Sequence, residues 1–164
     1  MMSRVPSIVL LDVNVWLDNY LPGRPAATDS RLLLDWLDHR SVAIAYPITA
    51  PSTVFYLIKQ ALKQASRIGG KVLEQGDART IEEIAWACIE NMAEIGTPVG
   101  ADTSDFWLAR KYRSIHSDLE DNLVLAAAER AQVDYLVTSD KTLLMKSTVP
   151  ALSPHDFVQV VCMS

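Results

Sequence analysis

Ile8-Val9-Leu10-Leu11-Asp12-Val13-Asn14 is the stretch that decides the fold of this chain. Its four consecutive apolar residues are typical of a strand buried on both faces of a parallel sheet. If strand geometry persists past Leu11, Asp12 and Asn14 point to the same side, because side chains alternate along a strand. The Asn14 carboxamide is then placed to hold the Asp12 carboxylate or a water. The alternative interpretation, equally weighted, is that Asn14 only forms a turn.

Strand-like and helix-like segments alternate along the rest of the chain. Apolar runs predict further strands at 42–48 and 133–138, with a last one near 157–161. Helical periodicity predicts a helix capped by Thr28 or Asp29, and a short helical turn at 141–145. Longer helices are expected over 52–66, 77–94, 102–112 and 119–131. No repeat or linker divides the sequence, so we expect a single α/β domain over residues 1–164 with a central, mainly parallel sheet.

Composition narrows the class of protein. The chain is 49% hydrophobic and 21% charged, as in an ordinary soluble globular domain. Cys88 and Cys162 belong to no CxxC motif, which favours a reduced, cytoplasmic setting without structural zinc. No apolar run is long enough to cross a membrane, and none resembles a signal peptide. The net charge of −5 counts mildly against a nucleic-acid substrate but suits a basic protein partner.

Three aspartates stand where a strand ends or a helix begins. Asp12 follows the first strand, Asp140 follows Tyr135-Leu136-Val137, and Asp121 lies in the first turn of the preceding helix. Each alone has an ordinary interpretation as a cap. However, the carboxyl ends of parallel strands share one edge, so Asp12 and Asp140 should meet, with Asp121 alongside. Crowded carboxylates repel one another, and a bound divalent ion offsets this repulsion. Mg²⁺ or Mn²⁺ is the expected ion, because the site consists of oxygen ligands. Ser139 is placed to orient Asp140 or a metal-bound water.

Three motifs together resemble the PIN domain family. Leu10–Asp18 resembles its opening motif, Asp118–Leu123 its central acidic motif, and Tyr135–Asp140 its closing motif. They occur in family order, and the resemblance extends from Ile8 to about Phe157. It implies a three-layer α/β/α fold and cleavage of single-stranded RNA by a divalent-metal mechanism, with Asp12, Asp121 and Asp140 as the metal-binding acids. VapC-like toxins of toxin–antitoxin pairs would be the nearest relatives, which implies a small antitoxin partner and a homodimer.

One position departs from the family pattern. PIN domains usually carry an acid near the start of the helix after the second strand, whereas this chain has Thr53 there, or Ser52 if the register slips by one. A hydroxyl can bind a metal-held water but brings no negative charge, so tight binding of a second metal is in doubt. Glu120 would compensate if its side chain faces the site. Neighbouring residues on a helix splay about 100° apart, so a solvent-facing Glu120 is an equal alternative.

The histidines and tryptophans bear on the choice between a ribonuclease and two rival functions. His39, His116 and His155 have no metal-ligand spacing, so imidazole ligation is not expected. Four tryptophans are candidates to stack on bases or to anchor a partner helix, although most are expected in the core or half-buried: Trp16, Trp36, Trp86 and Trp107. Trp16 is the best candidate for a groove, because it closely follows Asn14. The sequence therefore predicts a metal-dependent ribonuclease. One rival is a binding or regulatory module of the same fold that lacks an acid. A second, less favoured, is a phosphotransferase of the haloacid-dehalogenase type, which would need an aspartate where Asn14 stands.

Overall fold

The strand Ile8–Leu11 (β1) lies at the centre of the sheet. The computed structural model describes residues 5–163, and within them the sheet has five strands in the order β3-β2-β1-β4-β5. Every pairing is parallel, which confirms the predicted α/β fold. The other strands are β2 (Ala43–Pro47), β3 (Thr97–Val99), β4 (Tyr135–Val137) and β5 (Ala151–Leu152).

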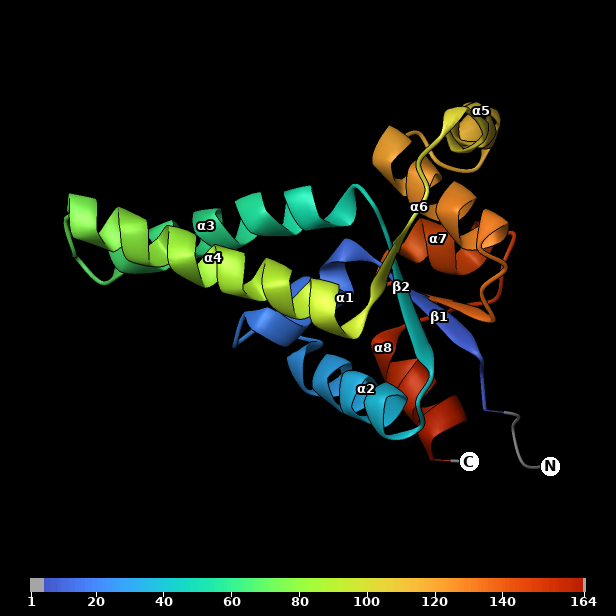
Figure 1. Ribbon diagram of the computed structural model, residues 1–164, viewed down its shortest axis with the longest axis horizontal. Coiled ribbons are helices and arrows are strands. Elements are labelled where there is room, and N and C mark those ends of the chain that lie inside the picture. Colours follow the sequence, from blue (N-terminus) through green and yellow to red (C-terminus); the bar gives the residue numbers. More distant parts are fainter. Residues whose placement is uncertain (1–4, 164) are drawn as a thin grey trace.

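Helices cover both faces of this sheet and make three layers (Figure 1). Val9 and Leu11 of β1 point into one core and Leu10 into the other, because successive side chains of a strand face opposite ways. The first core also contains α1, α2, α3, α4 and α8, while the second is closed by α6, against which α5 packs. The helices are α1 (Val13–Tyr20), α2 (Ala27–His39), α3 (Ala50–Ile68), α4 (Gln75–Ile95), α5 (Thr103–Lys111), α6 (Leu119–Arg130), α7 (Lys141–Lys146) and α8 (Pro154–Phe157), with a 3-10 turn η1 (Tyr112–Ser114) and a π-helical turn η2 (Val158–Cys162).

The helices α3 and α4 pack against each other and project from the sheet as an arm (Figure 1). The chain reverses near Gly70, whose φ of 76° is a conformation that favours glycine. Large apolar side chains on this arm, including Tyr56 and Trp86, remain exposed. Although α3 and α4 are the longest helices, no helix within residues 5–163 is both long and apolar enough to span a membrane.

The segment after β1 differs from the expectation. The strand does not persist past Leu11, because Asp12 caps a helix that begins at Val13. The expected alternation of Asp12 and Asn14 on one side of a strand is therefore wrong. Val13, Val15 and Trp16 are buried in this helix. Their burial against the core outweighs the strand preference of β-branched residues.

The ends of the sheet also differ. The predicted strand at 157–161 is wrong, because Phe157 ends α8 and the following residues form η2. Ser153 caps α8 by accepting the N–H of Asp156, and Pro154 at the first helical position favours this start. The last strand is instead β5, just before this cap. Strand β3 was not expected, since its three residues include Pro98.

Candidate functional site

Asp12 lies at the carboxyl end of β1, where it is almost fully buried. Its Oδ1 accepts the N–H of Val13 at 2.7 Å, and its Oδ2 accepts the hydroxyl of Thr138 at 2.8 Å. Burial raises the pKa of this carboxyl, the two hydrogen bonds lower it, and the negative charges of Asp140 and Glu120 raise it further. Asp12 is thus oriented by the protein and is electrostatically coupled to two other acids.

Asp140 reaches the same edge from β4. The register pairs Leu11 with Val137, and the N–H of Asp12 donates to the carbonyl of Val137 at 3.0 Å. Asp140 then caps α7, its Oδ1 accepting the N–H of Leu143 at 2.7 Å. The sheet therefore brings Asp12 and Asp140 to one edge, as the parallel-sheet argument predicts.

Asp121 joins this edge from the first turn of α6, together with a residue that sequence reasoning missed. Nε2 of His116 lies 3.1 Å from Oδ2 of Asp121 and 3.6 Å from Oδ1 of Asp140. His116, Asp121 and Asp140 offer possible metal-ligand atoms that all lie within 4.8 Å of one another. Imidazole ligation was not expected, yet the structure places His116 beside two of the predicted acids. The usable signal was that His116 lies two residues before the acidic motif that begins at Asp118.

A backbone contact orients the His116 ring. Nδ1 lies 3.0 Å from the N–H of Asp118, and a backbone N–H can only donate. Nδ1 is therefore the acceptor, and the ring proton of neutral His116 resides on Nε2, facing the two carboxylates. This arrangement supplies a donor to a crowded group of acids. For Nε2 to ligate a divalent ion, the ring proton would have to move to Nδ1 and the contact with the Asp118 N–H would have to break, because a neutral imidazole has only one acceptor nitrogen.

The electrostatics of Asp121 reflect this crowding. Desolvation by burial raises its pKa to about 6, and the charges of Asp12, Asp118 and Asp140 add to the rise, while His116 opposes it. Asp12 and Asp121 thus hold protons more tightly than free aspartate, because burial and neighbouring negative charges disfavour their ionised forms. A set of carboxylate oxygens with one imidazole nitrogen suits a divalent ion such as Mg²⁺ or Mn²⁺. The residues present therefore fit such an ion.

Glu120 faces this edge. The hydroxyl of Thr53 donates to Oε1 of Glu120 at 2.7 Å, which joins the start of α3 to the start of α6. Glu120 also raises the pKa of Asp12, so its charge lies near the buried carboxylate. The Glu120 side chain is nevertheless exposed to solvent, so it combines a contact with Thr53 and proximity to Asp12 with a solvent-facing position.

A family model described as a PIN domain matches residues 8–142. This chain belongs to the PIN domain family. PIN domains are generally nucleases and typically use divalent metals, which agrees with the donor set at the sheet edge. The match leaves the haloacid-dehalogenase alternative without support.

A solved structure shares the fold of this chain. The chain is similar to PAE2754 from Pyrobaculum aerophilum, with a TM-score of 0.59, 16% sequence identity and full coverage of both chains. At this identity the likeness concerns the fold alone. Among curated proteins, nothing matches this PIN domain.

The other residues singled out in this PIN domain take different places. The side chains of Asn14 and Ser139 form no hydrogen bond with any residue from 5 to 163. Thr138 links the acids instead, because its hydroxyl also accepts the N–H of Asp140 at 3.0 Å. Trp16 is 0% exposed and packs edge-on against Tyr46, so the expectation that it stacks on a base is wrong.

Proposed function

We propose that this PIN domain is an Mg²⁺- or Mn²⁺-dependent endoribonuclease that hydrolyses single-stranded or structured RNA. The observation that carries the proposal is the meeting of Asp121, Asp140 and His116 beside the buried carboxylate of Asp12. The acids come from three separate segments and share one edge of the sheet. No other group of three or more potential metal ligands of this kind occurs within residues 5–163.

Asp12, Asp121 and Asp140 would hold the metal, with His116 as an additional ligand. A bound divalent ion supplies a water of lowered pKa and offsets negative charge on the attacked phosphate. Thr138 and the N–H of Val13 fix the Asp12 carboxylate before any ion arrives. Such supporting contacts keep ligands in a productive geometry.

The rival proposal is a non-catalytic module, and Thr53 is the observation that favours it. The family acid is absent at this position, which weakens the case for a second ion. Glu120 reduces the weight of that argument, because the Thr53 hydroxyl holds its carboxylate near Asp12. We therefore favour an active enzyme in which Glu120 takes the place of the missing acid.

A toxin role in a toxin–antitoxin pair, acting on cytoplasmic RNA, is part of the proposal. It is supported by the resemblance of the three acidic motifs to VapC-like toxins. The exposed apolar side chains of the α3–α4 arm, such as Leu57, Ile84 and Trp86, suit a homodimer contact or an antitoxin. Light scattering of the purified chain, alone and with the product of any adjacent small reading frame, tests both partners.

The decisive test combines metal binding with RNA cleavage. Calorimetry with Mn²⁺ should show binding to the wild-type chain and strongly weakened binding to Asp12→Asn. A labelled RNA pool should be cleaved only by the wild type with Mg²⁺ or Mn²⁺. Asp35→Asn on α2 is the matched control, since this exposed acid lies on another element. A wild type that neither binds Mn²⁺ nor cleaves RNA would contradict the proposal.

A further inference from the structure

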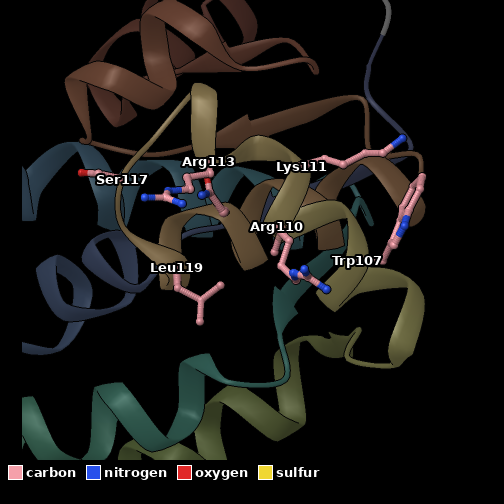
Figure 2. Close-up of a pocket in the computed structure, with 8 residues that line it drawn as sticks. Trp107, Arg110, Lys111, Arg113, Ser117 and Leu119 are labelled. Carbon is pink, nitrogen blue, oxygen red and sulfur yellow. The ribbon is translucent and has the colours of Figure 1, made fainter.

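A cationic cavity lies between α5, η1 and the start of α6 (Figure 2). It is next to the edge of the sheet where Asp12, Asp121 and Asp140 lie, which we call the carboxylate edge. Its volume is about 520 Å³. Three positive side chains line it, Arg110, Lys111 and Arg113, together with the ring of Trp107. None of the proposed metal ligands lines this cavity, so its chemistry is distinct from that of the carboxylates.

The three cations of the cavity are free of acidic partners. Within residues 5–163, none of them lies within 4.0 Å of a carboxylate, and the ion pairs of this part of the chain involve other lysines and arginines. In a chain of net charge −5, this is a local excess of positive charge. Guanidinium and ammonium groups attract a polyanion, and guanidinium groups match phosphate oxygens in geometry.

Two further features point to a nucleic acid. Trp107 is 52% exposed, and Nζ of Lys111 lies 3.7 Å from the centre of its ring. An exposed tryptophan with neighbouring cations is typical of surfaces that stack bases and hold the backbone. Asn122, which is buried, also lines the cavity, and its Oδ1 has no hydrogen-bond partner within residues 5–163. That oxygen has less than 1 Å² of accessible surface, so a base would reach it only after a shift of the surrounding side chains.

The cavity and the carboxylate edge share one segment of chain. His116 and Asp121 face the acids, while Ser117, Leu119 and Asn122 line the cavity. The Nδ2 of Asn122 donates to the carbonyl of His116 at 2.8 Å, which ties the two sites together. A strand that occupies the cavity therefore passes directly to the carboxylates.

We propose that this cavity binds the single-stranded RNA segment adjacent to the cleaved phosphate. The inference rests on the proposed ribonuclease function. Arg110 and Arg113 contact phosphates, and Trp107 stacks on a base. An acidic polypeptide could satisfy the cations, but it carries no row of planar bases to stack on the exposed ring of Trp107. The cavity thus favours RNA over an acidic protein partner.

The test measures binding without cleavage. Fluorescence anisotropy of a labelled oligoribonucleotide in EDTA compares the wild type with an Arg110→Gln/Arg113→Gln double variant. We expect affinity to fall on the order of tenfold, and the slope of log K against log salt to decrease by about 1.4, since each lost single-strand phosphate contact contributes about 0.7. The matched control is Arg31→Gln/Arg40→Gln, with Arg31 on α2 and Arg40 directly after it; α2 lies at the bottom of Figure 1 and α5 at the top. It should bind nearly as the wild type does.

A second readout uses the ring itself. RNA should quench the intrinsic fluorescence of the wild type, and Trp107→Phe should remove most of this quenching. Unchanged affinity and salt slope in the double variant, or equal losses in the control, would overturn the proposal. Competition by poly-glutamate as effective as that by RNA would also overturn it, in favour of an acidic polypeptide. A wild type that binds RNA through these residues but never cleaves it would instead contradict only the ribonuclease function.

Discussion

Thr138 donates its hydroxyl proton to Oδ2 of Asp12 across 2.8 Å. The same hydroxyl oxygen accepts the N–H of Asp140 at 3.0 Å, so one buried side chain orients two acids from different strands. Thr138 is well suited to this role, because a hydroxyl is both donor and acceptor. The link connects the geometry of the sheet to the geometry of the proposed metal site.

Replacing Thr138 by valine should weaken Mn²⁺ binding about 10- to 100-fold, the usual effect of losing a contact that orients a ligand. The protein should also lose about 1–3 kcal/mol of stability, because an acceptor and a donor remain buried without partners. Calorimetry and urea unfolding measure the two effects. Thr80→Val is the control, since this exposed threonine bonds only to the carbonyl of Gly76 within its own helix. Unchanged metal affinity in Thr138→Val would contradict the assigned role.

The metal-free protein should become less stable as pH rises from about 4 to about 6. The pKa of Asp121 is raised to about 6 in the folded chain, from an ordinary value of 3.8. Between these values the folded state keeps a proton that the unfolded state has lost, so the stabilisation present below pH 3.8 disappears as pH passes 6. The loss attributable to Asp121 is at most about 3 kcal/mol.

The variant Asp121→Asn isolates this effect, because asparagine cannot ionise. In EDTA at pH 7 it should be more stable than the wild type, and saturating Mn²⁺ should reverse the order. Urea unfolding across this pH range measures both. Identical pH curves for the two proteins in EDTA would show that Asp121 titrates normally.

His116 should affect the choice of metal. Oxygen ligands suit both ions, but Mn²⁺, as a transition ion, accepts an imidazole nitrogen more readily than the hard ion Mg²⁺. We therefore expect His116→Ala to reduce Mn²⁺ affinity on the order of tenfold, about 1.4 kcal/mol, and Mg²⁺ affinity by less. Titration calorimetry with each ion measures the difference, and His155→Ala is the control because this exposed ring lies near Asp29 instead. Equal losses for both ions would argue against direct ligation.

Glu120 should carry the negative charge that Thr53 lacks. Glu120→Gln should reduce the rate of RNA cleavage at least about tenfold, a minimal effect for a charge near the reacting phosphate. Introducing Thr53→Glu into the Glu120→Gln background should restore part of the rate. The exposed Glu94→Gln is the control. Full activity of Glu120→Gln would exclude compensation, and activity that appears only in Thr53→Glu would favour the non-catalytic rival.

The predictable part of the site depends on local pattern and sheet geometry. The consecutive apolar residues of β1 point to both faces of the sheet, so both faces had to be buried. The parallel pairing of β1 with β4 then brings Asp12 and Asp140 to the same edge. The family resemblance was confirmed by the match over residues 8–142. The predicted metal-binding roles of Asp12, Asp121 and Asp140 stay predictions.

The missed features depend on tertiary contacts. His116 and Asp140 are 24 positions apart in the sequence but lie close together in the fold. They form no short metal-binding motif from which this contact could be predicted. Helix α1 was missed because Val13-Asn14-Val15-Trp16 alternates like a strand, although packing against the core makes it helical. Strand β3 is short and contains Pro98, whose preferences oppose strand assignment.

The central position of β1 has a consequence for synthesis of the protein. Asp12 and Thr138 are 126 positions apart, so a growing chain presents the first acid long before its partner has been made. A nascent polypeptide that ends before β4 contains Asp12 and Asp121 but lacks both Thr138 and Asp140. Assembly of the pocket is therefore delayed until translation has passed this last part of the sheet. Proteolytic removal of the segment that contains β4, Thr138 and Asp140 would abolish the proposed metal site of the mature protein.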